Sequence, residues 1–409
     1  MRYNTFTLAN GLRVIHLEAA SPVVYCGYVV GAGTRDEAPG EEGMAHFCEH
    51  LTFKGTQKRK AVQVISSLEK VGGDLNAFTT KEDTTFYAAV LREHVSRAVA
   101  LLTDMVFHST YPQTEIDKEV EVICDEIESY NDSPSELIYD EFENLVFANH
   151  PLGRNILGSA ERLRSFTTDD ARRFTRRFYL PCNAVFFVYG DVDFMKIVKQ
   201  LERETSDFAS AQPLLGRSES TPVPPYVARE LTVSKGTHQA HVMAGCRAYG
   251  AHDHRRMPLY LMNNILGGPA MSARLNIVLR ERKGLVYTVD SSMVCYSDTG
   301  MWCVYFGCDP GDAGKCRRMV GREIAAMTRK PLSAARLLAA KRQIKGQIGV
   351  ACDNREGFAL DFGKSFQHYG KGKDIDALFR RIDGITADEI LSVARETFAP
   401  GRLTTLMFV

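Results

Sequence analysis

A proline-rich segment, residues 212–226, most constrains how this chain of 409 residues can fold. It reads QPLLGRSESTPVPPY and has neither helical nor strand periodicity. Proline fixes φ and removes a backbone N–H, so such a stretch favours a linker between compact domains. We therefore expect an N-terminal domain over residues 1–211, a linker over 212–226 and a C-terminal domain over 227–409.

The two halves show the same order of strand and helix patterns along the sequence. This predicts a degenerate tandem repeat of one α+β domain. Each half has early strands, a Gly-Gly pair, two alternating strands and then long helices. In the first half we expect strands at 6–17, 23–30, 74–80, 84–91 and 183–189, and helices near 42–53, 60–71, 92–108, 113–130 and 134–148. In the second half we expect strands at 229–233, 241–246, 285–293, 300–308 and 403–409, and helices near 257–266, up to 282, 312–328 and 334–352.

Charge and hydropathy exclude several functional classes. The chain has 50 Lys+Arg and 50 Asp+Glu, a balance that gives no support to binding of nucleic acid or of an anionic membrane. No run of 18 apolar residues predicts a membrane span. The ten cysteines are scattered without a CxxC pair, as in a reducing compartment. The first residues lack a secretory or import pattern, so we expect a cytoplasmic protein, most simply a bacterial one.

The motif His46-Phe47-Cys48-Glu49-His50 carries the clearest chemistry. On a helix His46 and His50 lie one turn apart on the same face, where two imidazoles can hold one Zn²⁺. Glu49 precedes the second histidine and can take a proton from water. The pattern HxxEH is the inverse of the HExxH peptidase motif.

A tight zinc site needs a third protein ligand, and the helix expected at 113–130 offers two. Its inward stripe is apolar except for Glu119 and Glu126. A carboxylate on a core-facing stripe costs several kcal/mol unless it is paired or binds a cation. Spacing alone does not choose between the two.

Together the segments GMAHFCEHLTFKGT and KEVEVICDEIE resemble the pitrilysin family of inverted-motif zinc peptidases. The likeness is greatest to the mitochondrial processing peptidase type and its bacterial relatives. It extends along the chain through FTLANGLRVI, GAGTRDE, LNAFTTKEDTTFY, LPCNAVFFVYGDVD, ILGGPAMSARL and RERKGLVYTV. The resemblance implies two homologous α+β domains, each an antiparallel-rich mixed sheet backed by helices, clasped around a central chamber.

The resemblance also implies roles for individual residues. Glu126 would be the third zinc ligand and Glu119 would support the site from behind. Arg280 and Tyr287, seven apart as in the family, would face the zinc and hold the substrate carbonyl or the oxyanion. The strand Asn76, Ala77, Phe78 and Thr79 would be an edge that binds peptide by main-chain hydrogen bonds.

We therefore expect a zinc-dependent endopeptidase with one Zn²⁺ per chain that hydrolyses extended or unfolded peptides. Glu49, Arg280 and Tyr287 would be catalytic. Two alternatives share the fold or the metal. One is a non-catalytic scaffold subunit, like the core subunits of respiratory complexes. The other is a zinc hydrolase with a non-peptide substrate, which a covered Asn76–Thr79 edge would favour and an open edge would disfavour.

The expected partners are the peptide substrate and a second subunit. Chains of this size in the family usually pair. Because both the zinc motif and the Arg/Tyr pair are present, we expect a homodimer. The alternatives are a chain that works alone and a heterodimer containing a metal-free sister subunit.

Overall fold

The computed structural model describes residues 2–208 and 221–409. The chain divides into two compact units, each built from three separate stretches of sequence. Unit 1 is Met1–Glu128, Arg154–Thr221 and Cys352–Asp374; unit 2 is Ser129–Gly153, Pro222–Ala351 and Ile375–Val409. Among the described residues, no helix combines the length and the apolar character needed to cross a bilayer.

Unit 1 is built on a six-stranded sheet with the order β1-β2-β6-β3-β5-β4. Only the pair β2–β6 is parallel, and the other neighbours are antiparallel. The central strand β3 is buried along most of its length, and β4 forms one edge. The strands are β1 (Asn4–Thr7), β2 (Arg13–Leu17), β3 (Val23–Val30), β4 (Asp74–Thr79), β5 (Thr84–Leu91) and β6 (Ala184–Tyr189).

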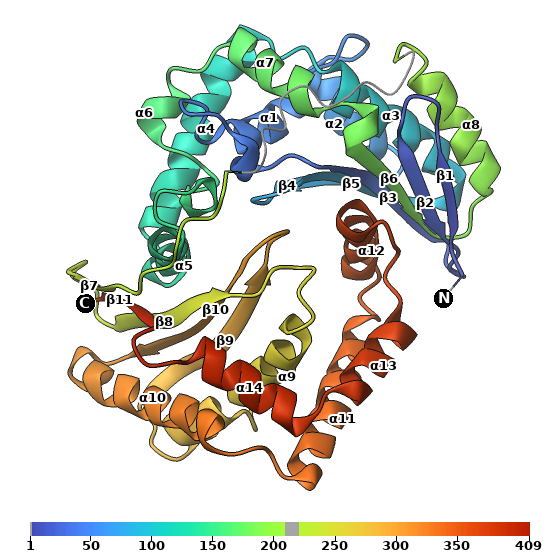
Figure 1. The fold of residues 1–409 in the computed structure, drawn as a ribbon. Coiled ribbons are helices and arrows are strands. Elements are labelled where there is room, and N and C mark those ends of the chain that lie inside the picture. Colours follow the sequence, from blue (N-terminus) through green and yellow to red (C-terminus); the bar gives the residue numbers. More distant parts are fainter. Residues whose placement is uncertain (1, 209–220) are drawn as a thin grey trace. The chain divides into compact units, whose positions relative to one another are not determined.

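Helices from the first half cover this sheet and close its apolar core. Figure 1 shows them in blue to green along the strands. Helix α3 packs on β3 and β5, and α1 packs on α7 and on β4. The helices are α1 (Met44–Thr52), α2 (Ala61–Glu69), α3 (Val95–His108), α4 (Gln113–Asn131), α6 (Ala160–Leu163), α7 (Thr168–Phe178) and α8 (Phe194–Glu204).

Unit 2 repeats the arrangement with a five-stranded sheet of order β7-β11-β8-β10-β9. Again one pair, β11–β7, is parallel, while the rest are antiparallel. The predicted class, two related α+β domains with antiparallel-rich mixed sheets backed by helices, is confirmed. The strands are β7 (Glu230–Val233), β8 (Ala240–Ala248), β9 (Val286–Cys295), β10 (Gly300–Cys308) and β11 (Thr404–Phe408).

The helices of unit 2 bury one face of this sheet around Trp302 and Phe306. They are α9 (Arg256–Gly267), a short π-helix η5 (Asn276–Glu281), α10 (Ala313–Arg329), α11 (Ala334–Ala351), α13 (Ile375–Gly384) and α14 (Ala387–Thr397).

Each unit takes one helix from the opposite half of the sequence. Helix α12 (Arg355–Tyr369), red in Figure 1, packs on β3 and β6 of unit 1. Helix α5 (Pro134–Val146) packs on β8 and β11 of unit 2. The strands that receive them hold matching places in the two sheets, so the exchange follows the repeat. The division at residues 212–226 stays a prediction, and residues 212–220 of that linker lie outside the described residues.

Two features differ from the expected elements. Residues 6–17 were predicted as one strand but form the hairpin β1–β2, because Asn10-Gly11 makes a turn with Gly11 at φ +87°. Helices α7, α8, α12, α13 and α14 were not predicted. Helix α7 has only Ala171, Phe174 and Phe178 on its apolar stripe among charged residues, which weakens a periodicity signal.

Buried charge fixes α12 to the β4–β5 hairpin. Asp83 is 3% exposed. Its carboxylate forms ion pairs with Lys364 Nζ and with His368 Nε2, each at 2.9 Å. Burial alone would raise the pKa of Asp83, but these two cationic groups outweigh it, and the pKa is lowered. The C-terminal half of the sequence thereby holds the strand pair that includes β4.

We predict that Asp83→Asn lowers the free energy of unfolding by about 2 kcal/mol at pH 7, since it removes the charge from a buried ion-pair network. Folding lowers the pKa of Asp83 below its ordinary value of 3.8, so the stabilisation from the charged carboxylate is complete above pH 3.8. That stabilisation is lost as the pH falls through the lower, folded-state pKa. The gap between wild type and variant should therefore close as urea unfolding is repeated at decreasing pH.

The matched control is Asp361→Asn on the same helix. Asp361 pairs with Lys373 at 2.6 Å, but its side chain is 60% exposed. Such a surface pair contributes at most about 1 kcal/mol. Equal losses in the two variants, or a gap for Asp83→Asn that does not change with pH, would contradict this account.

Candidate metal centre

Helix α1 is anchored at its N-terminus by a buried carboxylate. Gly43, at φ +94°, precedes the helix, and a Cβ there would lie 2.9 Å from the backbone of Gly158. Both oxygens of Glu37 accept backbone N–H groups, from Gly43 at 3.1 Å and from Ala45 at 2.9 Å. These are donors that a helix start leaves unpaired. Burial nevertheless raises the pKa of Glu37.

The helix places His46 and His50 side by side, with ring centroids 4.5 Å apart. Glu126 of α4 faces both of them. Its Oε2 lies 3.9 Å from His46 Nε2 and 3.7 Å from His50 Nε2. One ligand atom from each of the three residues falls within 4.8 Å of the others, so they form a group that could hold a metal ion.

The spacing suits zinc. Bonds of about 2.0–2.1 Å at tetrahedral angles put ligand atoms roughly 3.3 Å apart. Donor separations of 3.7 and 3.9 Å exceed that value by a few tenths of an ångström, and neither is a hydrogen-bond distance. Two imidazoles and a carboxylate that approach one point without bonding each other are a donor set that fits Zn²⁺.

The surroundings shift the pKa values of the two histidines in opposite directions. Burial, then the neighbouring His50, lowers the pKa of His46 to about 3, so its ring is neutral at pH 7. Burial also opposes protonation of His50, but the bond with Glu119 and the surrounding carboxylates outweigh it and raise its pKa. Glu119 Oε1 lies 2.9 Å from His50 Nδ1. This contact orients the ring so that Nε2 points toward Glu126.

Glu119 is held in turn by Lys54. The ammonium lies 2.5 Å from its Oε2. Burial would raise the pKa of Glu119, but the bonds to His50 and Lys54 lower it. Glu119 is therefore an ionised carboxylate behind His50, while Glu126, 36% exposed, is the carboxylate on the open side of the histidines.

Glu49 is buried on the same helix and is bonded to the edge strand. Its Oε2 accepts the Thr79 hydroxyl at 2.5 Å. Burial, with a smaller contribution from Glu126, raises the pKa of Glu49 despite that bond. A carboxylate with a raised pKa is suited to take up and release a proton near neutral pH.

The predicted substrate strand is β4, which lies at the edge of the unit 1 sheet. It pairs with β5 on one side, and no described strand pairs with its other side. The Ala77 N–H donates to the Asn76 side-chain oxygen at 2.8 Å. Among the described strands of unit 1, the Asn76–Thr79 edge is therefore open. An open edge disfavours the alternative of a zinc hydrolase with a non-peptide substrate.

Arg280 and Tyr287 both belong to unit 2. Arg280 lies on η5, and its side chain is 46% exposed. Tyr287 lies on β9 and is 83% exposed. An exposed phenol and guanidinium are free to contact a substrate, and their predicted roles stay predictions.

Sequence reasoning missed Glu37 and Lys54. Glu37 lies six residues before the glycine that starts α1, in the segment GAGTRDE. A helix beginning at Gly43 has no side chain of its own to cap it, and that is the signal that an acceptor must come from elsewhere. Lys54 lies one turn after His50, but its partner on α4 is not visible in the sequence.

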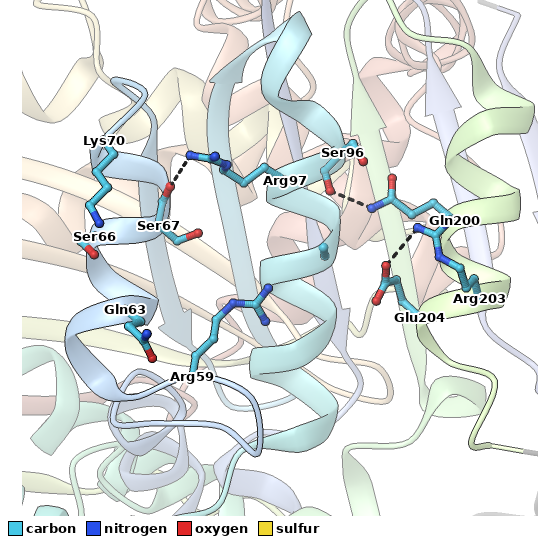
Figure 2. A pocket seen from close by; sticks show the side chains of 11 residues that line it. Arg59, Gln63, Ser66, Ser67, Lys70, Ser96, Arg97, Gln200, Arg203 and Glu204 are labelled. Atoms are coloured by element: carbon cyan, nitrogen blue, oxygen red, sulfur yellow. Dashed lines mark hydrogen bonds and ion pairs between the residues drawn. The ribbon is translucent and has the colours of Figure 1, made fainter.

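Unit 1 also has a hollow of about 660 Å³ between α2, α3 and α8 (Figure 2). Arg97 donates to the Ser67 carbonyl at 3.3 Å, and Gln200 donates to the Ser96 carbonyl at 2.7 Å. Its lining residues include no imidazole or thiol and one carboxylate, Glu204. The hollow therefore lacks the donors of a zinc site.

Comparison with known families covers most of the chain. Residues 13–160 match the family described as insulinase (peptidase family M16). Residues 165–344 match the domain described as the peptidase M16 inactive domain. The candidate metal ligands all lie within the first of these two matches.

Similar proteins are named zinc proteases. An uncharacterized zinc protease of Bacillus subtilis, YmxG, is 33% identical over 395 residues, which is 96% of this chain and 95% of that protein. An uncharacterized zinc protease of Rickettsia bellii is 30% identical over 97% of this chain and 95% of its own length.

Solved structures share the fold. The crystal structure of a protease from Helicobacter pylori matches with a TM-score of 0.90 and 21% identity, covering 100% of this chain and 99% of that one. A peptidase M16 inactive domain from Pseudomonas fluorescens matches with a TM-score of 0.90 and 17% identity, covering 100% and 98%. With full-length relatives above 30% identity, this chain belongs to peptidase family M16, the pitrilysin family.

Proposed function

We propose that the chain is a zinc-dependent endopeptidase that cleaves extended or unfolded peptides. The observation that carries the proposal is the convergence of His46, His50 and Glu126 on one point. Glu49, a buried carboxylate with a raised pKa, lies on the same helix. A scaffold protein has no chemical need for all four groups together.

His46, His50 and Glu126 would hold the metal, and Glu119 would hold His50. His46 is ready to coordinate because its pKa is about 3 and its ring carries a lone pair at neutral pH. Bound zinc would supply Lewis acidity, which polarises a carbonyl and lowers the pKa of water. Residues 2–208 and 221–409 contain one such donor group, which supports one zinc per chain.

Glu49 would move the proton. Its carboxylate accepts one from the attacking water and later delivers it to the leaving nitrogen of the cleaved peptide bond. The Thr79 hydroxyl holds one Glu49 oxygen, which leaves the other oxygen for that proton. Because Thr79 lies on β4, this bond couples the base to the strand that would carry the substrate.

A peptide would add to the free edge of β4 as a further strand, over Asn76, Ala77, Phe78 and Thr79. Main-chain hydrogen bonds recognise an extended backbone more than a side-chain sequence. That mode of binding selects unfolded segments. Arg280 and Tyr287 would contact the substrate carbonyl.

The assembly we propose is a homodimer in the cytoplasm, because one chain carries both the metal group and the Arg/Tyr pair. A heterodimer with a metal-free sister subunit would need this chain as its catalytic half. In both assemblies the substrate is a peptide, and the partner adds surface rather than ligands.

We expect Glu49→Gln to lower kcat for a quenched fluorescent peptide by at least about 100-fold, because it removes the proton acceptor. Zinc content measured on the same samples should stay at one per chain. Glu128→Gln, an exposed residue of α4, is the control and should change neither. If Glu49→Gln cleaves as fast as wild type, Glu49 is not the base.

We expect substitutions of the two α4 carboxylates, Glu126 and Glu119, to weaken zinc binding by different amounts. Glu126→Gln removes a ligand and should weaken zinc binding by more than about 100-fold in a chelator competition. Glu119→Gln removes only the group behind His50 and should weaken it by about 10–100-fold. The reverse order would exchange the two roles, and an unchanged affinity in both variants would remove α4 from the site.

We expect Ala77→Pro to raise KM for extended peptides about tenfold with little change in zinc content. Proline is tolerated at a free strand edge, but it removes an N–H that a bound peptide would use. Ala77→Ser keeps that N–H and serves as the control. Unchanged KM in Ala77→Pro would show that peptides do not add to this edge.

A further inference from the structure

Unit 2 contains a cavity of about 750 Å³ that none of the proposed catalytic or metal-binding residues lines. It lies between the end of α9, the segment 272–274, η5, α10 and the first half of α11. Its volume is in the range of cavities that hold small organic ligands. One wall is the π-helix η5, a backbone form found frequently at functional sites.

The floor of the cavity is apolar. It is formed by side chains that are partly or fully buried, namely Ile265, Ile277, Val278, Leu332 and Ala340. Apolar walls of this kind retain a hydrophobic ligand body by removing its surface from water. They give no reason for a strongly polar or multiply charged ligand to enter.

The rim is cationic. Arg274 is already paired with Glu323 at 2.7 Å. Arg282 and Arg336 also line the cavity, and neither has an anionic partner among the residues described at 2–208 and 221–409. Three guanidinium groups and one carboxylate leave an excess of positive charge. Guanidinium groups bind carboxylates in a paired, directional geometry.

A buried donor in the wall is also unused. Asn264 is 7% exposed and lines the cavity, and its Nδ2 is a buried atom that makes no hydrogen bond within the described structure. The neighbouring Asn263 shows the usual behaviour, since it bonds Ser291 and accepts the Trp302 indole N–H at 2.8 Å. An unpaired buried donor is costly, but an atom this enclosed cannot be reached by a ligand in the cavity unless the wall moves.

We propose that this cavity binds a small organic carboxylate with an apolar body. The carboxylate binds Arg282 and Arg336. The apolar part covers Ile265, Ile277 and Val278. The site goes beyond the proposed peptidase reaction, because its residues belong to unit 2 and none takes part in metal binding or proton transfer.

Two sources share this chemistry, a free acid and the C-terminal residue of a peptide. A second cavity of about 430 Å³ shares Arg274, Leu332 and Arg336 with the first. Met327, Ile390 and Leu391 continue its apolar lining. The two cavities are therefore neighbours, and the test has to separate the two sources.

The test is calorimetric titration of the full-length protein with octanoate and with N-acetyl-leucine. Their uncharged counterparts, octanamide and N-acetyl-leucine amide, are the matched probes. At least one acid should bind, and its uncharged counterpart should bind at least about tenfold more weakly, because each charge-assisted bond is worth about that factor. The tighter acid identifies the source.

Variants locate the site. Arg336→Gln should weaken binding of the preferred acid about tenfold. Arg342→Gln, also an exposed arginine of α11 but outside the cavity, should leave it unchanged. Absence of binding by both acids, equal binding of acid and amide, or an equal effect of the two arginine variants would overturn the proposal.

Asn264→Leu separates ligand binding from folding. The substitution keeps the side-chain size and removes a donor that is unpaired, so the melting temperature of the free protein should not fall. Affinity for the acid should also stay unchanged, because the enclosed Nδ2 does not face the ligand. An equal loss of affinity in Asn264→Leu and Arg336→Gln would contradict binding through the arginines.

Discussion

The concentration of carboxylates around two imidazoles is the constraint on which the rest of unit 1 depends. Glu49, Glu119 and Glu126 lie near one another in a largely buried place, where like charges repel strongly. Lys54 and His50 compensate Glu119, and Thr79 gives Glu49 one hydrogen bond. Glu126 faces the two imidazoles at 3.7 and 3.9 Å, which are longer than hydrogen bonds. A dication between the histidines and Glu126 would restore the balance, which is why the group suits a metal better than a structural role.

The surrounding fold is organised to hold helix α1 in that place. Its N-terminus is buried, so its backbone donors need an acceptor, and Glu37 supplies two oxygens. Gly43 and Gly158 approach so closely that a side chain on either would collide with the other segment. On the opposite side, β4 is fixed through its hairpin by Asp83, Lys364 and His368. The site therefore depends on α12, a helix that comes more than 270 residues after Asp83.

Local pattern predicted the parts of this site that lie on single elements. The i, i+4 spacing of His46 and His50 and the inward stripe of α4 pointed to residues that the structure brings together as a group that could hold a metal ion. They could not choose between Glu119 and Glu126, because both face inward and only the contact with each imidazole nitrogen distinguishes them. The Asn10-Gly11 pair is a turn signal, and it divides the expected strand at 6–17 into β1 and β2. The exchange of α5 and α12 was not predictable, since periodicity does not say which sheet a helix covers.

The two units show how one repeated fold serves different chemistry. Their sheets share strand order and the position of the single parallel pair, so packing alone would make them equivalent. Yet the helix between β8 and the β9–β10 hairpin, α9, reads RMPLYLMNNILG and has no histidine, cysteine or carboxylate. Its buried polar residues are two amides, of which only Asn263 is satisfied. The fold fixes where a buried polar group can lie, and the side chain at that position decides its chemistry.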